Sequence, residues 1–210
     1  MNTVNRSELK AKYGNEMVFV VHQDDIPFFE EGFTLQRPDV LDVLQSKGVF
    51  APRYLVEYNT IVRQPIPYIL VRQDGMYFAT TRLDGSGEAR LHGKMSLGVG
   101  GHINPVDSSD NMFLKAMTRE LFEELTIKGQ GEINLDVNFH GVINDNSNAV
   151  SQDHIGLVFV VDAQNLNVEV RETDKLVGGF YTIEELSGNY ERLESWSQIV
   201  FDVIQRGYIK

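Results

Sequence analysis

The segment from Tyr68 to Arg82 constrains the fold of this chain more than any other. Two apolar, β-prone runs, YILVRQ and MYFATTR, flank the dipeptide Asp74-Gly75. Such a dipeptide between two such runs is the strongest short-range signal for a β-hairpin, because both central residues of the tight turn need a positive φ. We therefore expect two antiparallel strands here, with a β-sheet built around them.

Further strands and a few helices are predicted on both sides of this hairpin. Strands are expected at 16–23, 53–62, 133–143, 154–163, 167–172 and 178–182, and helices at 38–48, 110–125 and in the region after residue 182. The last region opens with Thr182 and Glu185 at capping-box spacing. Many strands with two or three helices predict an α+β fold, a mixed sheet packed between helices as an α-β-α sandwich.

Two prolines mark the best candidate for a domain boundary. Pro65 and Pro67 punctuate the chain directly before the hairpin. We expect an N-terminal extension at 1–62, made of a strand, a short helix and a strand, and a core domain at 63–210. The extension could supply the interface of a homodimer.

Charge and composition limit the classes of function. The net charge of −11 disfavours a broad nucleic-acid surface, although a divalent metal could still bridge a small phosphorylated ligand. The chain has no cysteine, so disulfides, thiolate metal sites and cysteine nucleophiles are excluded. No apolar run is long enough to span a membrane, and the polar start of the chain is unlike a signal peptide. We expect a cytoplasmic protein.

The run KAMTRELFEELTI, residues 115–127, places three glutamates within about one and a half helical turns. At about 100° per residue, five apolar residues fill one arc of this helix: Phe113, Leu114, Met117, Leu121 and Leu125. Glu120 and Glu124 border that arc with Glu123 beside them, whereas Lys115 and Arg119 fall on the opposite, solvated side. A solvated acidic face with an Arg119–Glu123 pair is the simpler explanation. Repulsion between partly buried carboxylates favours a site for Mg²⁺ or Mn²⁺ instead.

A glycine pair precedes this helix in the segment GVGGH, residues 98–102. Paired glycines between a strand and a helix indicate a backbone that must approach another group closely, or simply a tight turn. His102 and His154 are expected to make local hydrogen bonds. The loop 83–93 before this segment carries no recognisable code for reading a base or a sugar.

Together, the glycine pair and RELFEELTI resemble the Nudix box, over residues 101–127 of a wider likeness that spans about 60–205. That box has a glycine, five residues, a glutamate, seven residues, then Arg-Glu-aliphatic-any-Glu-Glu-any-Gly-aliphatic. Gly101 stands 18 positions before Arg119 where the box has 14, so an insertion of about four residues is inferred in NPVDSSDN. Asn111 replaces the first glutamate, for which Asp107 or Asp110 could substitute. Thr126 replaces the closing glycine, so an altered helix exit is expected, extended toward Gly129.

The resemblance implies a Nudix fold and the hydrolysis of a diphosphate linkage in a nucleoside diphosphate derivative or a related phosphorylated small molecule. It implies Glu120, Glu123 and Glu124 as ligands of Mg²⁺ or Mn²⁺, with Glu120 and Glu123 catalytic and Glu123 able to activate water. Further roles implied by the resemblance are substrate binding for Gly100, Gly101 and, more weakly, Arg82, orientation of a carboxylate for Arg119, and a weak distal base in Glu172.

Three other functions were weighed against this one. A related isomerase of allylic diphosphates would need a catalytic cysteine, which the chain lacks. An acidic interaction domain explains the charge but not the glycine pair at its spacing. A non-catalytic sensor that binds a nucleotide or related ligand stays open, because Asn111 and Thr126 depart from the box.

Overall fold

A computed structural model describes residues 5–37, 39–83, 93–130, 133 and 135–209. Most of the loop at 83–93 therefore lies outside the described residues. None of the described helices is long and apolar enough to cross a membrane.

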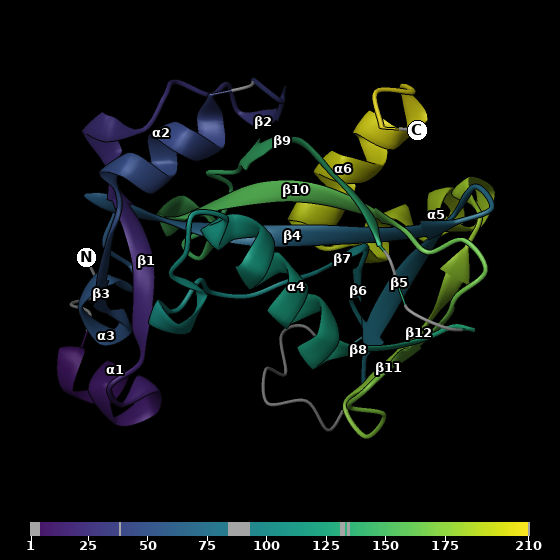
Figure 1. The fold of residues 1–210 in the computed structure, drawn as a ribbon, viewed down its shortest axis with the longest axis horizontal. Coiled ribbons are helices and arrows are strands. Elements are labelled where there is room, and N and C mark those ends of the chain that lie inside the picture. The colour runs from purple at the N-terminus through teal and green to yellow at the C-terminus, as the bar shows by residue number, and fades with distance from the viewer. Residues whose placement is uncertain (1–4, 38, 84–92, 131–132, 134, 210) are drawn as a thin grey trace.

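A mixed sheet forms the centre of the molecule (Figure 1). Its order is β12 (Leu176–Tyr181), β5 (Met76–Arg82), β4 (Val62–Gln73), β10 (His154–Asp162), β9 (Asp136–Asn144) and β2 (Gly32–Leu35). The two central strands, β4 and β10, run parallel, whereas the other pairs on this path are antiparallel. Both central strands are buried along almost their whole length because helices cover both faces.

The predicted hairpin is confirmed. Strands β4 and β5 pair antiparallel next to the turn, where Asp74 has a φ of 50° and Gly75 a φ of 76°. These are the positive φ values that the Asp-Gly dipeptide indicated. Two short strands, β6 (Met95–Ser96) and β7 (Gly98–Val99), pair with β5 and β4 and lead into the glycine loop.

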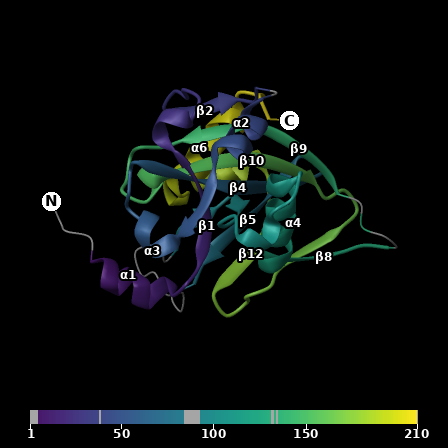
Figure 2. The ribbon, with the colours of Figure 1, turned by 60° about the vertical axis from the view of Figure 1, so that its left-hand side comes forward.

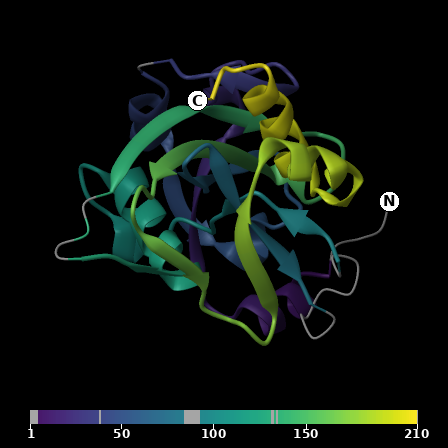
Figure 3. The same ribbon diagram turned by 90° about the vertical axis from the view of Figure 1, so that its right-hand side faces the viewer.

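Helices cover both faces of the sheet, which confirms the predicted α-β-α sandwich (Figure 3). Helix α4 (Met112–Glu124) packs on one face, with the core around Ile69, Leu157 and Phe159. Helices α5 (Ile183–Gly188) and α6 (Ser195–Gln205) pack on the other face, with the core around Leu70 and Val158. The predicted capping box is present, because Thr182 and Glu185 bond each other's backbone N–H groups.

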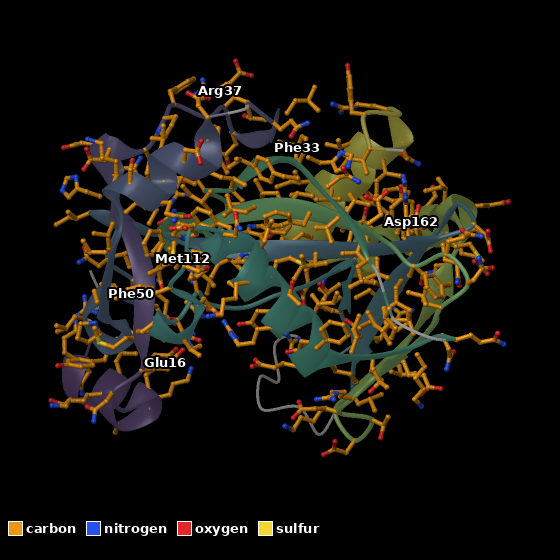
Figure 4. All side chains as sticks on the ribbon, viewed as in Figure 1. Glu16, Phe33, Arg37, Phe50, Met112 and Asp162 are labelled. Carbon is orange, nitrogen blue, oxygen red and sulfur yellow. The ribbon has the colours of Figure 1, made fainter. Side chains whose placement is uncertain are left out.

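The N-terminal segment joins the sheet in two places, because β2 forms the edge next to β9 and β1 pairs with the start of the central strand β4 (Figure 2). It contains α1 (Arg6–Tyr13), β1 (Met17–His22), α2 (Val40–Lys47), β3 (Val49–Pro52) and α3 (Arg53–Val56). Strand β1 pairs with β3 and with the start of β4. Phe50, labelled in Figure 4, packs edge-on against Phe19, with ring centroids 5.5 Å apart. That residues 1–62 form a separate unit stays a prediction.

Two sequence-based expectations for secondary structure were wrong. Residues 53–62 do not form one extended segment, because Arg53–Val56 is helical. Arg53 pairs there with Glu57 four residues on and with Glu16, each at 3.2 Å. The second error concerns α4, which does not extend toward Gly129 but passes directly into β8 (Leu125–Lys128), paired with β11 (Asn167–Val170).

Candidate functional site

Helix α4 places its three glutamates at different depths. Glu120 is buried with 8% of its surface exposed, Glu124 is half-buried, and Glu123 is exposed. Glu120 and Glu124 thus border the buried stripe of the helix as predicted. Leu114 was wrongly assigned to that stripe, since 42% of its surface is exposed.

Arg119 does not lie on a solvated face, which corrects the sequence analysis. Its Nε and Nη2 donate to the two carboxylate oxygens of Asp107, at 3.0 and 2.7 Å. Nη2 also donates to the backbone carbonyl of His102, at 2.9 Å. From Nη1 it reaches Glu120 at 2.7 Å and Glu123 at 3.1 Å. Arg119 therefore contacts two carboxylates of α4 and has its main anchor in Asp107, while its role in orienting a carboxylate for the reaction stays a prediction.

Asp107 is a site residue that the sequence alone could not distinguish from Asp110. It ends a short 3₁₀ helix, Pro105–Asp107, inside the inferred insertion, and only 1% of its surface is exposed. Its Oδ2 also accepts from the backbone N–H of Asn104, at 2.9 Å. The sequence offered Asp107 and Asp110 equally, and only the fold shows that the first one faces Arg119.

The glycine pair lets the loop pass between β4 and α4. A Cβ atom on Gly100 would lie 1.9 Å from the backbone carbonyl oxygen of Pro67, which cannot move aside easily. A Cβ atom on Gly101 would lie 2.4 Å from Oε2 of Glu120. The close approach expected from the sequence is thus made to the protein's own backbone and to a site carboxylate. Binding of substrate by Gly100 and Gly101 stays a prediction.

Burial and like charge act on the site carboxylates together. Burial raises the pKa of Glu120, against the lowering effect of Arg119, and Glu123 and Glu124 raise it further. Burial also raises the pKa of Glu124, followed by the negative charge of Glu172, while Arg82 lowers it. No described residue donates a hydrogen bond to the Glu124 side chain. The fold therefore brings both weaker candidates, Arg82 and Glu172, within electrostatic reach of Glu124.

Arg82 and Glu172 each have a partner of their own. Arg82 Nε lies 3.6 Å from Oε1 of Glu194, and Glu172 Oε1 lies 2.9 Å from Nζ of Lys175. Both pairs are partly exposed, so each contributes little to stability and can exchange for a ligand at small cost.

The carboxylates fit a hard divalent cation by their chemistry. Glu120, Glu123, Glu124 and Glu172 supply only oxygen donors, and a cation would relieve the repulsion that raises the pKa of Glu120 and Glu124. Within the described part of the chain, however, no three acidic or histidine side chains converge closely enough to hold an ion as they stand. Arg119 draws Glu120 and Glu123 to itself. Rotation of these side chains would be needed to form the site.

A pair of histidines supports the glycine loop, which confirms their expected local hydrogen bonding. The Nε2 atoms of His102 and His154 lie 3.3 Å apart, and Nδ1 of His154 lies 2.5 Å from the backbone oxygen of Val150. Burial lowers the pKa of His102 well below its usual value, and the nearby Arg53 and His154 lower it further. His102 is therefore neutral near pH 7 and acts as a fixed support.

The chain is similar to known proteins in both sequence and structure. No family model matches the chain. Protein YmaB of Bacillus subtilis (strain 168) is 33% identical over 205 residues, which cover 91% of this chain and 98% of that protein. The crystal structure of Tm1382, a protein assigned to the Nudix hydrolases, has a TM-score of 0.76 at 28% identity, covering 91% of this chain and 99% of Tm1382. DR0079 from Deinococcus radiodurans is more distant, with a TM-score of 0.48 at 16% identity over 70% of this chain and 84% of its own.

Proposed function

The chain belongs to the Nudix hydrolase superfamily, and from this membership we propose that it hydrolyses a diphosphate linkage with the help of Mg²⁺ or Mn²⁺. The substrate would be a nucleoside diphosphate derivative or a related phosphorylated small molecule. The observation that carries the proposal is the state of Glu124, a half-buried carboxylate with like-charged neighbours and no hydrogen-bond donor among the described residues. Such a group is unfavourable unless a cation binds it.

Glu120 and Glu124 are the residues that would hold the cation, with Glu123 as an additional ligand. Both lie near the C-terminal end of α4, and Gly101 leaves room for the Glu120 carboxylate. A bound divalent ion would neutralise charge on the diphosphate and on the transition state. The protein's own part is to hold these oxygens in place.

Arg82 is the residue proposed to contact the phosphorylated substrate. It stands at the end of β5, and its charge already acts on Glu124. A guanidinium suits phosphate oxygens because its planar N–H donors can pair with two of them. Its pair with Glu194 would open when substrate binds.

Glu123 is proposed to remove a proton from the attacking water. Its carboxylate is exposed, and its only bond from a described residue comes from Arg119 at 3.1 Å, so it can turn toward a substrate. Glu172 is the alternative base, and its ion pair with Lys175 would have to break first.

The test is a release assay across nucleoside di- and triphosphates, ADP-ribose, dinucleotides and capped nucleotides. Wild type is compared with Glu120→Gln and with Glu184→Gln, which removes an exposed glutamate on α5 as a matched control. We expect metal-dependent release in wild type and Glu184→Gln and a loss of at least about a hundredfold in Glu120→Gln, the scale of removing one electrostatic contact to a transition state. Tight nucleotide binding without hydrolysis by wild type would instead identify a sensor.

A further inference from the structure

A cavity of about 500 Å³ lies away from the carboxylates of α4, between the N-terminal segment and the start of β4. Its walls come from Gln23 and residues 26–29, from Arg63 on β4, from Asn144 at the end of β9 and from Ile155 on β10. Ile155 belongs to the face of the sheet that α4 covers. None of the residues that line this cavity belongs to the site proposed above for the metal and the diphosphate.

Arg63 is the unusual group in this cavity. Only 6% of its surface is exposed. Its Nε and Nη2 donate to the backbone carbonyl of His154, at 3.2 and 2.6 Å, and Nη2 also donates to Oδ1 of Asn144 at 3.0 Å. Nη1 has no acceptor among the described residues, and none of their carboxylates lies within ion-pair distance of the guanidinium. A buried charge is normally paired, so this one lacks a partner that the cavity has room to supply.

The surrounding charges limit what that partner can be. Burial lowers the pKa of Arg63, and Asp153, Glu31 and Asp145 oppose this from beyond contact distance. Each of these carboxylates has its own partners: Asp153 accepts from Tyr58, Asp145 from Ser147 and Ser195, and Glu31 from Asn146. These three carboxylates act on Arg63 without contacting it, so a ligand with two negative charges would be repelled more strongly than a monoanion.

The remaining lining is apolar on one side and polar on the other, where Gln23, Thr60, Asn146 and Gln152 lie. Phe29 is buried, whereas Phe28 has 83% of its surface exposed, and Ile26, Pro27 and Ile155 complete the apolar side. An aromatic side chain so exposed beside a cavity offers a surface on which a flat group can stack.

We propose that this cavity binds a small organic monoanion with a planar apolar portion, its oxyanion on Nη1 of Arg63 and its flat part against Phe28. A planar guanidinium donor suits carboxylate and phosphate oxygens alike. Repulsion from Glu31 and Asp145 disfavours a phosphate dianion, so a carboxylate is the more suitable oxyanion for this cavity.

The experiment is an NMR titration of ¹⁵N-labelled protein with four probes: benzoate, acetate, benzyl alcohol and phenyl phosphate. The backbone amides of Phe28, Asn146 and Gln152 report on the cavity. Benzoate should bind most tightly, with a dissociation constant on the order of a few millimolar for so small a ligand. Acetate and benzyl alcohol should each bind at least about tenfold more weakly, because each lacks one half of the recognised group.

Three variants separate the contributions. Arg63→Met should weaken benzoate at least about tenfold and leave benzyl alcohol unchanged, because a charged hydrogen bond is lost. Phe28→Ala should weaken both benzoate and benzyl alcohol, and Glu31→Gln should tighten benzoate severalfold. Phe28 and Glu31 are exposed, so these two variants decide the question even if Arg63→Met fails to fold.

The proposal is overturned if benzoate shifts none of the cavity amides, if Arg63→Met binds benzoate as wild type does, or if phenyl phosphate binds more tightly than benzoate. The last result would show that the carboxylates around Arg63 do not set the charge of the ligand. Hydrolysis of diphosphates is not a readout here, so the outcome does not depend on the proposed function.

Discussion

Replacing Glu124 by glutamine should stabilise the protein in the absence of metal and remove most of its stabilisation by metal. Burial raises the pKa of Glu124, and Glu172 and Glu123 raise it further. A carboxyl group whose pKa is higher in the folded state contributes stability below its unfolded pKa and loses it as the pH rises through its folded pKa. At neutral pH the folded protein therefore carries a penalty that glutamine avoids.

The size of this effect follows from the neighbours of Glu124. One like-charged pair four residues apart on a helix costs about 0.2–0.5 kcal/mol. Glu120 is such a neighbour, and Glu172, which follows β11, adds a second like charge from outside the helix, while Arg82 and Lys175 partly offset both. A net gain of about 0.5 kcal/mol would raise the Tm by about 1–2 °C in a chain of this size.

Differential scanning calorimetry with EDTA or with Mn²⁺ measures both halves of the prediction. At about one hundred times its dissociation constant, Mn²⁺ should stabilise wild type by about 2.7 kcal/mol, and Glu124→Gln should gain much less. The control Glu184→Gln should behave as wild type in both conditions. The reasoning is refuted if Glu124→Gln is less stable than wild type in EDTA, or if it gains as much from Mn²⁺.

Three further variants probe the support of the site. Asp107→Ala should destabilise the protein by about 2–3 kcal/mol in urea unfolding. This is somewhat less than the cost of breaking a fully buried ion pair, because Arg119 keeps its other contacts, and a change below about 0.5 kcal/mol would contradict the prediction. Gly100→Ala should cost at least about 1–3 kcal/mol in the same assay, because its Cβ would meet the Pro67 carbonyl oxygen; unchanged stability would show that the loop can move. Glu123→Gln should leave the Tm unchanged but lower kcat more than it raises KM, and an effect on KM alone would remove Glu123 from the chemical step.

Local sequence signals predicted the central elements correctly because those elements are specified by their own residues. Asp74 and Gly75 determine their turn, and the Thr182–Glu185 box determines the start of α5. The spacing of apolar residues also placed Glu120 and Glu124 at the edge of the buried stripe of α4. In each case residues within a few positions of one another carry the information.

The errors fall where distant residues decide the structure. Arg53–Val56 is helical although its sequence is β-prone, and Arg53 is held there by Glu16 and Glu57. Arg119 looked solvated on a helical wheel, since no wheel includes Asp107, which lies on another element. The exposure of Leu114 has the same origin, because only the fold shows which end of the apolar arc the sheet covers.

Hydrolysis in ¹⁸O-labelled water, followed by ³¹P NMR, tests the central claim most directly. Wild-type protein is incubated with the best-bound compound of the panel and with Mg²⁺ or Mn²⁺, between about pH 7 and pH 9.5. The rate of hydrolysis should rise with pH as the group that accepts the proton from water deprotonates. The account predicts cleavage between two phosphorus atoms, with ¹⁸O in one product phosphate and no reaction in EDTA. Tight binding of that compound with metal present, and no ¹⁸O in phosphate at any pH, would contradict it.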